Sequence, residues 1–283
     1  MIILKTQNAI IEQIIEVKSA GKTIGFVPTM GALHQGHLAL VKKCVAENDV
    51  AIVSIFVNPT QFNNADDLAC YPRNLDADAA LLENAGCKIV FAPNVNEIYN
   101  EQEIKKPFEF DFQGLDTVME GVFRPNHFNG VVQIVSKLFL LVQPDRAYFG
   151  EKDFQQLAII RLMTKTLNFP VKIVGCPIIR EESGLAFSSR NALLTEKERE
   201  IAAHIYAVLT ESKTFFNHTS VEELKSCVTA AIERKEPLKV EYFEIIDGNT
   251  LQNIEKWENS DYIIGCLTVY CGKVRLIDNI KYV

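Results

Sequence analysis

The sequence has no apolar run long enough to cross a bilayer and no basic cluster. A membrane-spanning helix needs about 20 consecutive apolar residues, so we expect no membrane partner. The net charge of -7 comes without a stretch of lysines and arginines, which argues against extended contact with nucleic acid phosphates. The N-terminal stretch MIILKTQNAIIEQ has neither a basic leader nor a small-residue cleavage site, so we expect no secretory signal.

The sequence also lacks any C-x-x-C pair, and its seven cysteines are an odd number scattered along the chain. This pattern predicts buried free thiols and a reducing cytoplasm, and it argues against a disulfide framework or a zinc site.

The composition is typical of a soluble globular protein, with 48% hydrophobic and 23% charged residues. The length of 283 residues allows one large domain or two ordinary ones.

Short apolar runs alternate with helical patterns through the first 180 residues. The runs carry little polar alternation, which is typical of strands covered on both faces. The alternation predicts an α/β fold, a Rossmann-like doubly wound parallel sheet. The predicted order is strand 22–28, helix from 37, strand 49–58, helix 74–86, strand 88–93, helix 128–143, strand 146–150, helix 154–167 and strand 171–180.

A second, smaller α+β domain is predicted over residues 181–283, after a first domain over residues 1–180. The boundary lies in the polar, turn-rich stretch EESGLAFSSRNALLTEKERE. Amphipathic helices are predicted near 195–216 and 220–235, and strands over 239–248, 261–272 and 273–280.

The stretch VPTMGALHQGHLALV places His34 and His37 where a strand ends and a helix begins. Gly31 and Gly36 have the spacing of a phosphate loop, but His37 and Leu38 stand where that loop requires Lys and Ser/Thr. A glycine-bearing turn at a helix N-terminus still offers N–H groups to an anion, and the histidines can add donors. One alternative is that one histidine caps the helix and the other lies on the surface. A second is a metal-binding pair, but no third ligand stands at zinc-site spacing.

Two further stretches place polar side chains just after predicted strands. SIFVNPTQF carries Asn58 and Gln61, whose amides suit hydroxyls and a carboxylate, although this stretch taken alone favours an ordinary Asn-Pro turn. YFGEKDFQQL carries Gly150, Lys152 and Asp153, which suit phosphate, ribose or Mg²⁺ but are also common in a solvated loop.

Two loops add further candidates. GLAFSSRNALLT gathers Ser188, Ser189 and Arg190 at the apparent domain junction, either to close over a triphosphate or as a polar hinge before a helix capped at Thr195. FRPNHFNGV contributes Arg124 and His127 from a polar loop, without support from spacing.

Taken together and in this order, PTMGALHxGH, SIFVNPTQF, FGEKDFQQL and SSRN closely resemble the pantoate–β-alanine ligase (pantothenate synthetase) family. That family belongs to the cytidylyltransferase-like, class I tRNA-synthetase-like nucleotide-binding superfamily. The resemblance runs through most of residues 22–195 and recurs at VRLIDN near the C-terminus. It implies ATP-dependent joining of (R)-pantoate to β-alanine through a pantoyl adenylate, giving pantothenate, AMP and pyrophosphate. It also implies Mg²⁺ with the ATP, a homodimer, and a second domain that closes over the active site.

The resemblance assigns roles residue by residue. His37, His34, Lys152 and Arg190 are the implied catalytic donors, with His37 usually assigned as the acid. Gln61, Gln156 and Asn58 are implied to bind pantoate, Gln61 also β-alanine, and Asp153 the metal. The implied ATP-binding residues are Met30, Gly31, Ala32, Leu33, His34, Gln35, Gly36, His37, Gly150, Glu151, Lys152, Asp153, Ile179, Phe187, Ser188, Ser189 and Arg190.

Two positions depart from the family pattern. Asn126 stands where Gly is usual, and Asn is the next most tolerant residue of a left-handed backbone. Phe187 replaces the more familiar Met or Leu. Two rival functions are a nucleotidyltransferase, which has no need of Gln61 and Gln156 as a pantoate pair, and a catalytically silent nucleotide-binding module, which has no need of so many phosphate-directed donors.

Overall fold

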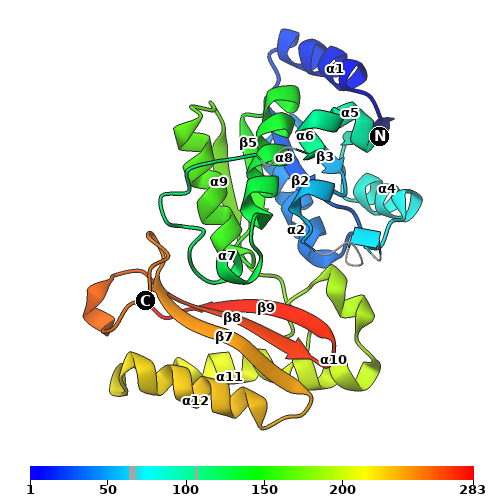
Figure 1. Ribbon diagram of the computed structural model, residues 1–283. Coiled ribbons are helices and arrows are strands. Elements are labelled where there is room, and N and C mark those ends of the chain that lie inside the picture. The colour runs from blue at the N-terminus through cyan, green and yellow to red at the C-terminus, as the bar shows by residue number, and fades with distance from the viewer. Residues whose placement is uncertain (64–67, 70, 106–107) are drawn as a thin grey trace. The chain divides into compact units, whose positions relative to one another are not determined.

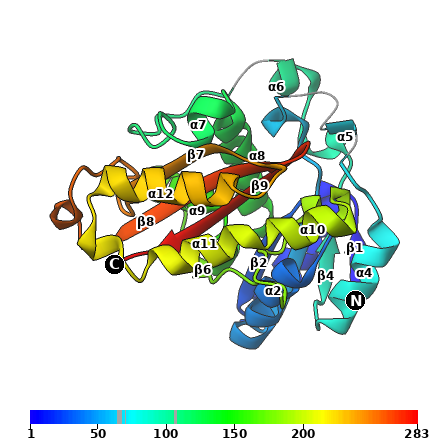
Figure 2. The ribbon, with the colours of Figure 1, turned by 90° about the horizontal axis from the view of Figure 1, so that it is seen from below.

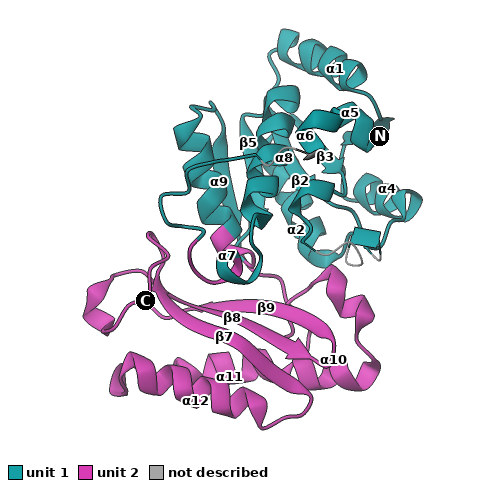
Figure 3. Cartoon of the chain, viewed as in Figure 1, with its two compact units in different colours: residues 1–116, 121–151, 156–176 teal, residues 117–120, 152–155, 177–283 magenta. Residues whose placement is uncertain are grey.

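The computed structural model describes residues 1–63, 68, 69, 71–105 and 108–283. The chain divides into two compact units (Figure 3). Unit 1 comprises residues 1–116, 121–151 and 156–176, and unit 2 comprises residues 117–120, 152–155 and 177–283. The main change of unit therefore follows residue 176, and two short segments from earlier in the chain also belong to unit 2.

Unit 1 is built on a six-stranded sheet in the order β1-β4-β3-β2-β5-β6 (Figure 1). All neighbouring strands in it are parallel, which confirms the predicted parallel α/β sheet. The strands are β1 (Ile2–Leu4), β2 (Ile24–Thr29), β3 (Val50–Ile55), β4 (Ile89–Phe91), β5 (Arg146–Gly150) and β6 (Lys172–Cys176).

Helices cover both faces of this sheet. Successive side chains of a strand point to opposite faces, and Ile24 and Phe26 of β2 join one hydrophobic core while Val27 joins the other. The first core is closed by α1 (Gln7–Ser19), α8 (His127–Val142) and α9 (Phe154–Thr166). The second is closed by α2 (Gln35–Glu47) and α4 (Leu75–Asn84). The short helices are α5 (Val95–Ile98), α6 (Glu101–Lys105) and α7 (Glu120–Phe123).

Unit 2 is an α+β unit with an antiparallel sheet in the order β7-β8-β9. Its strands are β7 (Leu238–Asp247), β8 (Ile263–Cys271) and β9 (Val274–Lys281). Figures 1 and 2 show α11 (His204–Ser212) and α12 (Val221–Glu233) along one face of this sheet. The single helix predicted over 195–216 is wrong, because α10 (Glu196–Ala202) and α11 are separate helices that meet at Ala203.

Some local features confirm the sequence predictions and others were missed. Asn126 has a φ of 64°, the left-handed backbone that Asn tolerates. The six described cysteines are free thiols, and five of them are buried, but the prediction of buried thiols is wrong for Cys227, which is exposed. Cys70 lies outside the described residues. β1 and α1 were not predicted. Among the described residues, no helix combines the length and apolar character that a membrane span requires.

Candidate active site

Three predicted site segments leave neighbouring strands of unit 1 at the same edge of the sheet. β2 lies between β3 and β5, and the sheet grows in opposite directions on its two sides. The histidine loop (residues 30–37) follows β2, the Asn58–Gln61 turn follows β3, and Glu151 follows β5. Ligands of open α/β sheets bind outside the carboxyl ends of strands at such a switch point. The topology therefore gathers these segments where a ligand is expected.

His34 and His37 together cap the first turn of α2. The Gly36 N–H donates to Nδ1 of His34 at 3.1 Å, and the His34 N–H donates to Nδ1 of His37 at 3.4 Å. The two ring centroids lie 4.1 Å apart. A ring nitrogen that accepts a hydrogen bond carries no proton, so each neutral imidazole holds its proton on Nε2. Both histidines are thus cap residues, and the proton of each ring lies on Nε2.

Asp78 on α4 holds the backbone just before these histidines. Its carboxylate accepts from the Ala32 N–H at 3.0 Å and from the Leu33 N–H at 2.8 Å. Gly31 has a φ of +83°, and a Cβ there would come within 2.9 Å of Asp78 Oδ2. Only 3% of Asp78 is exposed, and this burial raises the pKa of its carboxyl although the two N–H groups act to lower it.

Asp78 is a site residue that sequence reasoning missed. It lies 46 residues after Ala32, in a helix whose capping by Asn74 was predicted and is confirmed. An acidic residue in the first turn of a helix is common because it complements the helix dipole. The sequence therefore held no signal that distinguished Asp78 from Asp76, which is exposed in the same first turn.

The turn after β3 is tied together by buried amides. Asn58, which is 1% exposed, donates from Nδ2 to Gln61 Oε1 and to the Gly130 carbonyl, both at 3.0 Å. Its Oδ1 accepts from the Tyr99 hydroxyl at 2.8 Å. Gln61 Nε2 in turn lies 3.1 Å from Met30 Sδ in the histidine loop. Asn58 therefore orients Gln61, and substrate contacts of either residue stay a prediction.

His127 and Arg124 support the same turn from α8 and the loop before it. His127 Nδ1 lies 2.8 Å from the Gln61 carbonyl, and its Nε2 lies 3.2 Å from an Arg124 nitrogen. Because arginine only donates, Nε2 accepts and Nδ1 carries the proton that reaches the carbonyl. A Cβ on Gly130 would meet the Thr60 carbonyl oxygen at 2.4 Å, so this helix needs glycine to approach the turn. The FRPNHFNGV stretch thus acts as a support for Gln61.

The FGEKDFQQL stretch is divided between the units. Gly150, Glu151 and Gln156 belong to unit 1, whereas Lys152 and Asp153 belong to unit 2. Among the described residues, no atom beyond the chain neighbours would lie within 4 Å of a Cβ on Gly150, so the space beside this backbone is open. Gln156 and Lys152 are half-buried, and Asp153 is exposed.

The predicted phosphate loop lies in unit 2 on a short arm, residues 179–191. The Phe187 N–H donates to the Ile179 carbonyl at 3.0 Å. Ser188 caps a short 3-10 helix, η2 (Ser189–Leu193), by accepting from the Arg190 N–H at 3.3 Å. Buried Asn191 donates to the Ala186 carbonyl at 3.1 Å and closes the base of the arm. The arm therefore presents Ser188, Ser189 and Arg190 from a structured turn.

Asp153 does not belong to a ready-made metal cage. Within the described part of the chain, no group of three or more His, Cys, Asp or Glu side chains could hold an ion. Mg²⁺ usually keeps several waters and is bound through one or two carboxylates plus substrate phosphates. Asp153 is a single carboxylate of this kind, and its role as a metal ligand stays a prediction.

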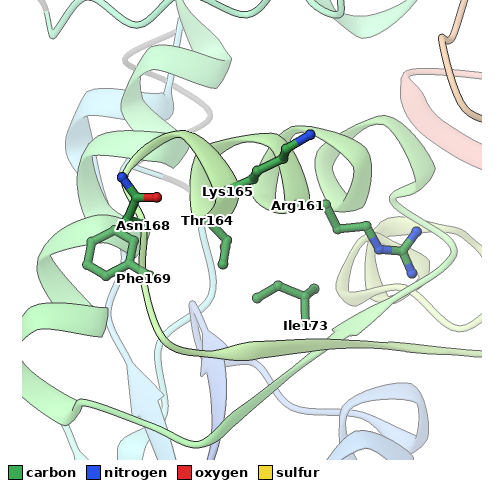
Figure 4. A pocket seen from close by; sticks show the side chains of 6 residues that line it. All are labelled: Arg161, Thr164, Lys165, Asn168, Phe169 and Ile173. Atoms are coloured by element: carbon green, nitrogen blue, oxygen red, sulfur yellow. The ribbon is translucent and has the colours of Figure 1, made fainter.

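A separate hollow lies in unit 1 between α9 and β6 (Figure 4). None of its lining residues is among the predicted site residues. They are Arg161, Thr164, Lys165, Asn168, Phe169 and Ile173.

A doubly wound sheet with hydrogen-bond donors at a helix N-terminus beside its switch point is the architecture of a phosphate-binding or nucleotide-binding α/β protein. A family model described as Pantoate-beta-alanine ligase matches residues 2–281. The chain belongs to this pantoate–β-alanine ligase family.

Curated relatives and solved structures agree with this assignment. The chain is 59% identical over 283 residues to a pantothenate synthetase of Phocaeicola vulgatus, covering 100% of this chain and 99% of the relative. It is 57% identical to that of Bacteroides thetaiotaomicron, with the same coverage. A pantothenate synthetase structure from Thermus thermophilus superposes with a TM-score of 0.89 at 40% identity, covering 100% of this chain and 99% of that one. The pantoate-beta-alanine ligase of Francisella tularensis, solved with beta-gamma ATP and beta-alanine, gives a TM-score of 0.80 at 37% identity, covering 100% and 98%.

Proposed function

We propose that the protein joins (R)-pantoate to β-alanine at the expense of ATP, releasing pantothenate, AMP and pyrophosphate. A carboxylate is a poor electrophile because its leaving group is poor, and adenylation replaces that group with AMP. In the first step a pantoate carboxylate oxygen attacks the α-phosphorus, and the bond to pyrophosphate breaks. In the second step the β-alanine amine attacks the acyl carbon, loses a proton and expels AMP.

The observation that carries this proposal is the paired histidine cap of α2. Both Nδ1 atoms accept backbone hydrogen bonds, so the proton of each ring lies on Nε2, the atom that we assign to developing charge. Such preorganised donors act most strongly where charge grows in a transition state. We assign His34 and His37 to phosphate oxygens as pyrophosphate departs, with the helix N-terminus adding its N–H groups and dipole.

Other residues of the family motifs complete the nucleotide contacts. Residues 30–37 and 150–153 bind ATP, with Lys152 countering phosphate charge. Ile179 contacts the adenine side through its backbone. Phe187, Ser188, Ser189 and Arg190 act on the phosphates from the arm of unit 2.

Pantoate is assigned to Gln61 and Gln156, and β-alanine to the neighbourhood of Gln61. The turn supports this assignment, because Asn58 and His127 fix the side chain and the carbonyl of Gln61 respectively. A buried, oriented amide loses little freedom on binding a ligand. Asn58 acts here by orienting Gln61.

Mg²⁺ accompanies ATP in this proposal, with Asp153 as an available oxygen ligand. The ion supplies neutralisation of phosphate charge. We further propose a homodimer, as in known relatives, and a cytoplasmic location, since free thiols persist in a reducing compartment.

The test is to incubate the protein with ATP and Mg²⁺, with pantoate and β-alanine added singly and together, and to follow AMP and pyrophosphate. We expect sustained AMP release only when both organic substrates are present. Sustained AMP release without β-alanine, or without pantoate, would overturn the proposal. A matched control is His218→Ala, which removes an exposed histidine of unit 2 and is expected to keep the wild-type rate.

A further inference from the structure

The VRLIDN stretch near the C-terminus resembles the family but has no role in the proposed chemistry. It forms most of β9, and its polar side chains bond to segments of unit 2 that lie far away in the chain. Arg275 makes a bidentate pair with Glu120 at 2.7 and 2.8 Å and a further bond to Glu241 at 2.9 Å. β9 therefore makes ion pairs and hydrogen bonds with segments of unit 2 that lie far from it in the sequence.

Asp278 fixes the start of the arm that carries the predicted phosphate loop. Its two carboxylate oxygens accept from the Arg180 guanidinium at 2.7 and 2.9 Å. Only 6% of Asp278 is exposed. Arg180 also stacks on the Tyr206 ring at 3.6 Å from the ring centroid and donates to the Gly184 carbonyl at 3.2 Å. Asp278 Oδ1 accepts the Asn279 N–H at 2.8 Å as well, which holds the next residue of the strand.

Asn279 reaches the segment that carries Lys152. Its side-chain Nδ2 donates to the Lys152 carbonyl at 3.0 Å, although the two residues are 127 positions apart. Asn279 is 9% exposed, so its amide is shielded from water that could compete for that carbonyl. The bond restrains the backbone of Lys152 directly.

Such a restraint matters because a lysine is long and flexible. Its ammonium is a point charge on a four-carbon stem, so it acts at a defined place only if its backbone is fixed. Residues 151–153 connect the end of β5 to α9. Gln155 in the first turn of α9 anchors this connection by accepting the Glu120 N–H at 3.0 Å and donating to the Val118 carbonyl at 2.9 Å. Asn279 supplies the restraint at the Lys152 end of this segment.

We propose that Asn279 is a positioning residue for adenylation, which acts by holding the Lys152 backbone so that the ammonium meets the ATP phosphates. This inference rests on the proposed function, because it takes Lys152 as the phosphate-directed cation. Asp278 holds Asn279 through its backbone and ties the same strand to the arm that carries Arg190.

The experiment measures pantoate-dependent exchange of labelled pyrophosphate into ATP for the wild type, Asn279→Ala, Lys152→Ala and the double variant. Displacing a catalytic group by about 1 Å costs up to about 10²-fold, so Asn279→Ala is expected to lower the maximal exchange rate by about 10- to 100-fold. The KM for pantoate, which unit 1 is assigned to bind, stays within about twofold. In the Lys152→Ala background the Asn279 substitution has little further effect, because residues that act as a unit are not additive.

A general structural role predicts a different pattern. If Asn279 only stabilises unit 2, its effect multiplies with that of Lys152→Ala, and the inference is overturned; unchanged exchange in Asn279→Ala overturns it equally. Asn279→Asp, which keeps the shape but replaces the donor by an acceptor, is tested in the same cycle if the alanine variant does not fold. Ser212→Ala is the stability control, since it removes a buried hydrogen bond to the Tyr282 hydroxyl in the same unit and is expected to leave exchange unchanged. If the wild type itself shows no pantoate-dependent exchange, the proposed function fails before this inference is reached.

Discussion

The contact of Asp78 with the histidine loop leads to a sharp prediction about Asp78→Asn. The carboxylate accepts two backbone N–H groups, whereas an amide has only one oxygen and turns its NH₂ toward the second N–H. A hydrogen bond to a charged group contributes about 1.5–3 kcal/mol. Burial has the opposite effect on stability. It raises the pKa of Asp78, so the folded state disfavours the ionised carboxyl and is stabilised when a neutral side chain replaces it.

The lost hydrogen bond and the relieved buried charge nearly cancel in the free energy of unfolding, but they do not cancel in catalytic activity. We expect the free energy of unfolding of Asp78→Asn to stay within about 1 kcal/mol of the wild type, since one lost hydrogen bond offsets one relieved buried charge. The loop is displaced just before His34, and a shift of about 1 Å costs up to about 10²-fold in rate. We therefore expect kcat to fall by about 10- to 100-fold, while Asp78→Ala, which leaves two N–H groups unmet, also loses about 2–4 kcal/mol of stability.

The pH dependence of stability has a defined sign. A carboxyl whose pKa is raised on folding binds its proton more tightly in the folded state, so its contribution is full below the ordinary Asp pKa and is lost as the pH rises through the raised value. The wild type should therefore lose stability relative to Asp78→Asn as the pH rises from about 4.

Urea unfolding between pH 3 and 8 and the AMP-release assay measure both properties. Asp76→Asn is the matched control, because it makes the same charge change at an exposed position of the same helix. Wild-type kcat in Asp78→Asn, or an equal loss in Asp76→Asn, would refute the role given to Asp78.

Three further predictions follow from single contacts. Burial raises the pKa of several thiols, that of Cys44 to about 12 and those of Cys87 and Cys176 to about 11. Among the described cysteines, Cys227 should therefore react first with a thiol reagent in native protein. A buried thiol of the native protein that reacts as fast as Cys227 would contradict this. Gly130→Ala forces a Cβ to within 2.4 Å of the Thr60 carbonyl and should cost about 1–3 kcal/mol by urea unfolding and raise the KM for pantoate; an unchanged KM would separate this turn from pantoate binding. His37→Ala should fold normally and lose about 10²-fold or more in kcat, as when one transition-state donor is deleted, and near wild-type turnover would remove His37 from the mechanism.

Local signals in the sequence accounted for most of the strands and longer helices of both units. Apolar runs and helical periodicity located β2 to β9 and the longer helices from α2 onward, because these patterns depend on residues a few positions apart. The Asn74 cap and the Thr195 capping box were read correctly for the same reason. The split between α10 and α11 was missed, since both halves carry apolar residues and no proline or glycine marks the break.

The sequence alone determined that the chain is an α/β protein, that donors gather after the first long strand, and that the combined motifs resemble pantoate–β-alanine ligases. It left open whether His34 and His37 cap a helix or bind an anion, and whether Arg124 and His127 have a role at the site. Tertiary structure decided that both histidines cap α2 and that Arg124 and His127 support Gln61. It also revealed hydrogen bonds between residues far apart in the chain: Asp78 to Ala32, His127 to Gln61, and Asn279 to Lys152. Spacing along a chain reports on neighbours within a helical turn or a strand pair, whereas these contacts form only once the sheets have set which loops meet at their edges.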